Sequence, residues 1–152
     1  MSESAQAHRK DEHLSLGVNL WRQQNFLTPG ASYEDVRWLP VVFPEMAVSD
    51  TDVSVDLFNH HFDWPFYIEA MTGGSELTGR INSQLAEVAR TTNLAMAVGS
   101  QSIALKEPDL ASTFKVARKQ HPDGFLIANL GADNPIENVR AAVDMIDRKS
   151  VV

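Results

Sequence analysis

Residues 66–75 read FYIEAMTGGS, and this stretch decides the fold. Residues 66–70 form a short, largely apolar run of the kind found in a buried β-strand. Thr72-Gly73-Gly74 is a glycine turn. After the turn, apolar residues recur at helical spacing, at Leu77, Ile81, Leu85 and Val88. A strand, a glycine loop and a helix in this order make one unit of an α/β fold.

Two more units of the same kind follow. Residues 94–98 and 125–130 are apolar and strand-like, and each run ends at a turn containing Gly99 or Gly131. Apolar residues at helical spacing mark the next two helices: Leu110, Phe114 and Ala117, then Ile136, Val139, Val143 and Ile146. The units repeat at about 30 residues, the length of a βαβ unit. This pattern predicts a parallel sheet with right-handed crossovers.

Two α/β architectures fit this pattern: a doubly wound open sheet and a (β/α)8 barrel, the TIM barrel. Pattern alone does not separate them. A complete barrel takes about 250 residues, and the chain has 152. Length alone therefore favours the open sheet.

The part of the chain before residue 66 is less regular. Residues 1–8 are polar and predicted to be disordered. A helix is predicted from about Lys10 to Gln24, and Thr28-Pro29-Gly30 breaks the chain after it. Residues 31–65 indicate irregular structure and short strands. We therefore divide the chain into 1–8, a capping segment at 9–65, three β/α units at 66–146, and an atypical tail at 147–152.

Composition excludes several classes of protein. The chain has no cysteine, which removes disulfides and thiolate metal sites. Its net charge of -7 does not suit general nucleic-acid binding, which needs a basic surface. No apolar run reaches the roughly 20 residues of a membrane span, and the polar start lacks the apolar core of a signal peptide. We expect a cytoplasmic protein of one domain with no nucleic-acid or membrane partner.

The predicted strand ends carry the candidate site, because ligands of parallel α/β folds bind at the carboxyl ends of the strands. These ends read Ala70-Met71-Thr72-Gly73-Gly74-Ser75, Gly99-Ser100-Gln101-Ser102 and Asn129-Leu130-Gly131-Ala132. Each offers glycine for close approach and a small polar side chain, which suits a flat cofactor with a phosphate tail. Each loop alone is also ordinary turn chemistry, and Ser75 is a possible helix cap. Three such loops in succession favour a site.

Charged residues elsewhere leave alternatives open. Arg9 and Lys10 together can hold a diphosphate, although a solvated helix start explains the same residues. His13 is either a ligand contact or a surface histidine. Glu69 is a charged residue in a buried-looking strand and needs a partner that the sequence does not name. His60 and His61 point to opposite sides if they lie on a strand, so they do not chelate one metal ion.

Several motifs together resemble one family. They are Arg9-Lys-Asp-Glu-His13, Asp35-Val-Arg37, Pro44-Glu45, Ala70-Met-Thr-Gly-Gly-Ser75, Ala97-Val-Gly-Ser-Gln101 and Ala128-Asn-Leu-Gly131. Their order and spacing, from about residue 8 to 146, resemble the type 2 isopentenyl-diphosphate isomerases. The resemblance implies a partial (β/α)8 TIM barrel, its first three β/α units preceded by an N-terminal helix and short strands.

The resemblance also implies chemistry and site residues. The family interconverts isopentenyl and dimethylallyl diphosphate in isoprenoid biosynthesis with reduced FMN. NADPH keeps the flavin reduced, and Mg2+ helps to hold the diphosphate. FMN would contact Ala70, Met71, Thr72, Ser100 and Asn129, whereas the substrate would contact Arg9, Lys10, Ser100, Gln101 and Ser102. A homo-oligomer is also implied, and no residue is assigned as catalytic or as a metal ligand.

The chain departs from the family pattern in two places. Residues 40–43 replace the histidine that the family often has before Pro44-Glu45. After Ile146 the family continues into a fourth strand and a Gln-Glu pair, whereas this sequence reads Asp147-Arg-Lys-Ser-Val-Val152. We therefore expect a truncated chain that is inactive alone. An FMN-dependent oxidoreductase of the 2-hydroxy-acid oxidase type is the alternative enzyme, and a fragment without function is the non-enzymatic one.

Overall fold

The computed structural model describes residues 5–23, 35–43 and 45–147. Its elements in chain order are α1 (Ala5–Arg22), η2 (Val48–Asp50), β1 (Val55–Leu57), β2 (His60–Phe62), β3 (Tyr67–Ile68), α2 (Glu76–Thr92), β4 (Ala95–Ala97), α3 (Ser102–Lys106), η3 (Pro108–Ala111), α4 (Ser112–Gln120), β5 (Leu126–Ile127) and α5 (Ile136–Ile146). The predicted break at residues 28–30 and most of the atypical tail lie outside the described residues, as do residues 1–4. The prediction of disorder over residues 1–8 is wrong for residues 5–8, which form the first turn of α1.

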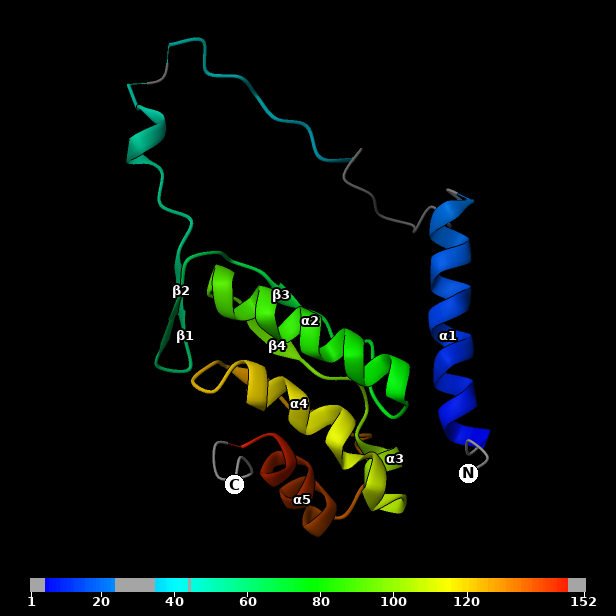
Figure 1. Cartoon of the computed structure of the whole chain (residues 1–152). Coiled ribbons are helices and arrows are strands. Elements are labelled where there is room, and N and C mark those ends of the chain that lie inside the picture. Colours follow the sequence, from blue (N-terminus) through cyan, green and yellow to red (C-terminus); the bar gives the residue numbers. More distant parts are fainter. Residues whose placement is uncertain (1–4, 24–34, 44, 148–152) are drawn as a thin grey trace.

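A three-stranded parallel sheet carries the fold, in the order β3-β4-β5. Met96 pairs with Ile68 on one side and with Leu126 on the other. These three side chains pack into the core, which α2, α4 and α5 complete from one side of the sheet (Figure 1). The parallel α/β pattern predicted from the sequence is therefore confirmed.

The sheet is open, so the predicted TIM barrel is wrong. In the described residues β3 and β5 are edge strands, and only β4 has a neighbour on each side. A barrel requires two neighbours for every strand. The length argument favoured a doubly wound open sheet, which has helices on both faces. The described sheet is open, but α2, α4 and α5 cover it from one side.

A two-stranded hairpin, β1–β2, lies against the amino ends of the parallel strands. Val55 pairs with Phe62 in antiparallel register. The turn residues Phe58 and Asn59 both have positive φ, at 54° and 59°, as a tight hairpin turn requires. The Phe58 ring stacks on Phe125, just before β5, with ring centroids 5.6 Å apart. This aromatic contact ties the hairpin to the sheet.

Helix α2 buries a face shifted from the one that its apolar residues predict, although Ile81 and Leu85 are half-buried and Leu85 packs against the core. Leu77 and Val88 are exposed, whereas its buried residues are small or polar: Thr78, Gly79, Asn82, Ala86 and Ala89. A Cβ on Gly79 would lie 3.2 Å from the Thr113 Cα, so α2 and α4 approach closely through small residues. Close approach of two helices excludes bulky side chains between them.

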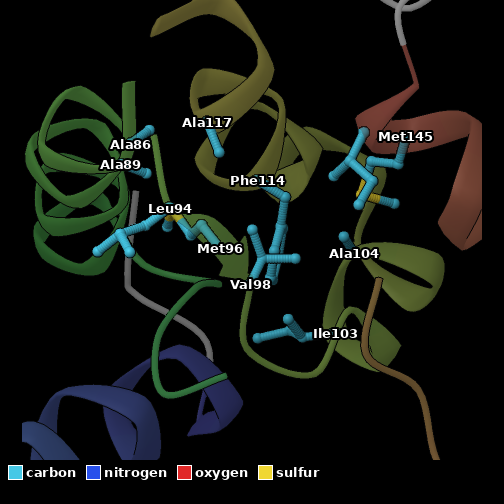
Figure 2. Close-up of a cluster of buried hydrophobic side chains, with 11 residues drawn as sticks. Ala86, Ala89, Leu94, Met96, Val98, Ile103, Ala104, Phe114, Ala117 and Met145 are labelled. Atoms are coloured by element: carbon cyan, nitrogen blue, oxygen red, sulfur yellow. The ribbon is translucent and has the colours of Figure 1, made fainter. Parts of the chain in front are cut away.

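Among the described residues, Phe114 on α4 is the largest fully buried side chain. Figure 2 shows its ring against Val98, with Ile103 beyond. Arg118, one turn further along α4, donates from Nε to the Ile146 carbonyl at 2.8 Å and from a terminal nitrogen to the Gly124 carbonyl at 2.8 Å. This buried arginine joins α4 to α5 through backbone acceptors, which satisfies its charge-bearing donors.

Candidate functional site at the carboxyl ends of the strands

The three strand-end loops lie side by side, as predicted. The Gly99 N–H donates to the Thr72 carbonyl at 2.7 Å, which joins the loop after β3 to the loop after β4. The Gln101 N–H donates to the Asn129 carbonyl at 2.9 Å, which joins the second loop to the loop after β5. Parallel strands place their carboxyl ends at one edge. Their loops form the polar edge that we call the rim.

Glycine is required at two positions of the rim. Gly73 has φ 141°, and a Cβ there would overlap the Phe114 ring, with Cζ at 2.6 Å. A Cβ on Gly99 would lie 2.7 Å from the Thr72 carbonyl carbon. Gly73 therefore leaves room for the Phe114 ring, and Gly99 allows its loop to approach the Thr72 backbone closely, the close approach for which the sequence offered glycine.

Thr72 holds the loop after β3 in place from inside. Its hydroxyl donates to Asn82 Oδ1 at 2.5 Å, and the Asn82 amide donates to the carbonyls of Thr72 at 3.3 Å and Thr113 at 3.0 Å. Both Thr72 and Asn82 are buried. The Thr72 hydroxyl is therefore engaged within the protein. Asn82 was not predicted from the sequence, because it lies outside the apolar spacing of Leu77, Ile81, Leu85 and Val88 that marked the helix.

Gln101, predicted to contact the substrate, is fully buried. Its amide donates to the Ala142 carbonyl at 2.8 Å, and its Oε1 accepts from the Asn129 N–H at 3.3 Å. Gln101 therefore connects two loops to α5. The hydroxyls of Ser100 and Ser102 lie 3.1 Å apart on half-buried residues, where a ligand can reach them.

The other predicted cofactor contacts lie on the surface of the rim. Met71 is 74% exposed, and Ala70 and Asn129 are half-buried. Glu69 finds the partner that the sequence did not name, because the Tyr67 hydroxyl donates to its Oε2 at 2.5 Å. That hydrogen bond, aided by the Ala70 N–H, lowers the pKa of the Glu69 carboxyl. Glu69 is exposed, so the prediction of a buried charge is wrong.

Helix α1 adds a cationic group to the rim. A groove of about 440 Å³ runs between α1 and the first strand-end loop. It is lined by Lys10, His13, Leu14, Gly17, Val18, Trp21, Met71, Thr72, Ile81 and Leu85. Burial, helped by the charge of Arg9, lowers the pKa of the Lys10 amine. Lys10 and His13 thus face the strand ends, while Arg9 is exposed one residue earlier.

The two histidines of β2 have separate surroundings. The His60 ring lies 5.5 Å from the Phe125 ring, whereas His61 Nδ1 lies 2.9 Å from Asp56 Oδ1. The hydrogen bond to Asp56 raises the pKa of His61. Across the described ranges, no three acidic or histidine side chains gather as metal ligands.

These features define the class of protein. It is an open parallel α/β unit with a polar, glycine-dependent rim at its strand ends and a lysine-bearing helix beside it, the arrangement in which such folds bind ligands. No helix within residues 5–23, 35–43 and 45–147 combines the length and apolar character of a membrane span.

Comparison with known proteins is more specific. The sequence matches no family model. It is similar to isopentenyl-diphosphate delta-isomerases of three bacteria. Identity is 51% over 144 residues with that of Lactococcus lactis, covering 95% of this chain and 42% of the relative. Identity is 41% over 145 residues with that of Latilactobacillus sakei, covering 94% of this chain and 40% of the relative. It is 39% over 143 residues with that of Listeria monocytogenes, covering 94% of this chain and 39% of the relative.

The chain therefore spans about two fifths of the length of the curated relatives that it matches. The assignment to the type 2 enzymes is corrected, because the relatives are named isopentenyl-diphosphate delta-isomerase without a type. The comparisons therefore show similarity to isopentenyl-diphosphate delta-isomerases without distinguishing a type.

Proposed function

We propose that the chain is the substrate-holding part of an enzyme that interconverts isopentenyl diphosphate and dimethylallyl diphosphate in isoprenoid biosynthesis. The names of the relatives support this reaction. The observation that carries the proposal to this chain is the half-buried Lys10 in a groove that ends at Met71 and Thr72. A cation beside a polar rim suits an anionic substrate with an apolar tail.

The substrate's two parts match two kinds of surface. Lys10 holds the diphosphate as a point charge, and Arg9 reaches it as a planar fork. The hydroxyls of Ser100 and Ser102 are further donors on the rim. The short hydrocarbon of the substrate lies along Met71, whose side chain is 74% exposed, and along apolar groove residues such as Leu14.

FMN is the cofactor that we propose for this rim, and the residues present fit it in part. Ala70 and Met71 offer apolar surface, while Ser100 and Asn129 offer polar groups. Thr72 and Gln101 support these residues through their internal hydrogen bonds instead of contacting the ring. Reduced FMN, when bound, supplies proton transfer to and from the substrate.

Two further partners, Mg2+ and NADPH, are proposed together with the substrate and FMN. Mg2+ is proposed to be held largely by diphosphate oxygens, as is common for this ion, and NADPH to keep the flavin reduced. Isomerisation moves a double bond without net oxidation, so NADPH is not consumed in each turnover. A homo-oligomer and a cytoplasmic location remain predictions.

Binding is the first test. Arg9→Ala in the 152-residue chain should weaken inorganic diphosphate binding by about tenfold to a hundredfold, because charge-assisted hydrogen bonds contribute about 1.5–3 kcal/mol. Titration calorimetry measures this. FMN binding, followed by quenching of flavin fluorescence, should not change. Arg80→Ala, an exposed arginine on α2, is the control. Equal losses of both ligands would contradict the proposal and make Arg9 structural.

Turnover is tested in a chimera. This chain replaces the matching 144 residues of the Lactococcus lactis relative, and the product, dimethylallyl diphosphate, is measured with FMN, NADPH and Mg2+ present. The chimera should be active, and Arg9→Ala within it should lose most activity at low substrate concentration. A folded chimera that binds FMN but makes no product would overturn the proposed reaction.

A further inference from the structure

A polar contact links α1 to the rim across 64 residues of sequence. The Ser75 hydroxyl donates to Asp11 Oδ1 at 2.5 Å. Ser75 is almost fully buried, and it is also the N-cap of α2, where its Oγ accepts from the Thr78 N–H at 3.2 Å. A hydrogen bond to a carboxylate is stronger than one to a neutral acceptor. The positive end of α2 further favours the Asp11 charge.

The apolar residues of α1 provide little other fixation. Leu16, Leu20 and Trp21 are exposed, Trp21 by 69%. A helix held by few apolar contacts can turn about its axis or move away from its neighbour. The contact between Asp11 and Ser75 removes this freedom next to Lys10. Lys10 then faces the groove beside Met71 and Thr72.

We propose that Asp11 is a positioning residue, whose hydrogen bond with Ser75 fixes α1 so that Lys10 faces the rim as an anion-binding group. The part of this inference that names a diphosphate rests on the proposed function. The positioning itself rests only on the contact between α1 and α2.

Because Asp11 is charged, the direction in which anion affinity changes when Asp11 is removed tests the proposal. Asp11 is a carboxylate beside the groove, so by Coulomb's law its removal alone would strengthen the binding of an anion. Loss of positioning has the opposite effect, because Lys10 no longer faces the anion. The direction of the change therefore separates the two explanations.

The first experiment measures inorganic diphosphate binding by calorimetry at one ionic strength. Asp11→Ala should weaken binding by about tenfold, which corresponds to the loss of one well-placed charge-assisted contact. Glu12→Ala removes the same charge from an exposed neighbour on the same helix and should leave binding equal or slightly tighter. Ser75→Ala should weaken binding as Asp11→Ala does, whereas Ser75→Thr, which keeps a hydroxyl, should retain it. Tighter binding by Asp11→Ala overturns the proposal.

The second experiment follows Lys10 without any anion. Lysine amines are labelled by reductive methylation with carbon-13 and titrated by NMR. The ionisable groups along this groove are Lys10 and His13 on α1, with Arg9 adjacent, while α2 and the loop after β3 contribute uncharged residues. In the original chain Lys10 should titrate below the ordinary lysine value, because burial lowers its pKa.

Asp11→Ala should raise the pKa of Lys10 towards the ordinary lysine value, and Glu12→Ala should not. Removing a negative charge alone would move it down, so the sign again decides. Asp11→Asn keeps an acceptor without the charge and should give an intermediate rise in the pKa of Lys10. This variant replaces Asp11→Ala in the test if Asp11→Ala does not fold. An unchanged or lower Lys10 titration overturns the positioning role. If the titration moves up but the original chain does not bind diphosphate, positioning stands and the proposed substrate class fails.

Discussion

The two ends of the parallel sheet are stabilised by different means. At the amino ends, rings of Phe58, His60, Phe62 and Phe125 gather around one another at centroid distances of 5.4–5.7 Å. At the carboxyl ends, the hydrogen bonds of Thr72, Asn82 and Gln101 fix the loops. Aromatic packing tolerates changes of angle, whereas hydrogen bonds require particular positions. The same strands therefore have an adaptable end and a fixed end.

The difference bears on where a ligand binds. A hollow of about 360 Å³ lies at the amino ends, lined by apolar residues such as Val55, Trp64 and Ile127. It offers volume but few directional groups. The groove beside the rim has Lys10 and backbone segments brought close by glycine. Orientation of a ligand depends on a few placed polar groups, so the fixed end is the better site. The following predictions test this contrast.

The largest effect is expected at Gly73. Gly73→Ala forces a Cβ into the Phe114 ring at a positive φ, and strain and overcrowding together should cost about 3 kcal/mol of unfolding free energy. Urea unfolding measures this. Gly17→Ala is the control, because nothing lies within 4 Å of its added Cβ; it should stabilise α1 by about 0.8–1 kcal/mol. If Gly73→Ala left the unfolding free energy unchanged, the rim would be adaptable and not fixed.

Asn82 should rank second. Asn82→Ala leaves the Thr72 hydroxyl without its acceptor and removes one donor from each of the Thr72 and Thr113 carbonyls, although the Thr72 carbonyl keeps the Gly99 N–H. Unpaired buried groups cost about 1–3 kcal/mol, so we expect a loss of about 2 kcal/mol together with weaker FMN binding. Gln84→Ala, exposed on the same helix, should change neither. Lower stability with unchanged FMN binding would show that Asn82 supports the fold of the rim without affecting its cofactor-binding surface.

Phe125 tests the adaptable end. Phe125→Ala removes three ring contacts, and because this residue is only half-buried the cost should be about 1–2 kcal/mol. Diphosphate binding at the opposite end should be unchanged. Thermal unfolding and calorimetry measure the two quantities, with exposed Phe43→Ala as the control. A loss of diphosphate affinity would show that the two ends are coupled.

The smallest effect should come from pH acting on His61. Its hydrogen bond to Asp56 raises its pKa in the folded protein, so the protonated form stabilises the hairpin. This contribution is complete below the unfolded pKa of about 6.5 and is lost as pH rises through the higher folded value. NMR titration of His61 should show the raised pKa, and Asp56→Asn should lower it. The exposed Asp109→Asn should leave it as it was.

The sequence predicted the order of the elements better than their faces. The 3.6-residue spacing of Leu77, Ile81 and Val88 identified α2, because a helix needs only the period. It could not identify the buried face, since that depends on how closely α4 approaches Gly79. In α5, Ile136 and Val143 are exposed, whereas Ile146 is buried as predicted, together with Ala142 and Met145. The short α3 was not predicted, because five residues carry too little periodicity.

For the site, the glycine loops were enough to predict that the strand ends meet. Sequence could not show which polar side chains turn inwards. Thr72 and Gln101 were expected to contact ligands, yet both form internal hydrogen bonds, while Ser100 between them remains accessible. The partner of Asp11 lies 64 residues away, and no local pattern identifies such a contact.

The turn of the β1–β2 hairpin has a consequence for the order of folding. A bulky residue such as Phe58 is strained at positive φ, so this turn does not favour an early, independent hairpin. The stacking of Phe58 on Phe125 compensates, and that ring is in place only after β5 has joined the sheet. The hairpin should therefore dock after the rate-limiting step. Phe58→Gly should accordingly change the unfolding rate much more than the refolding rate, with a φ-value near zero.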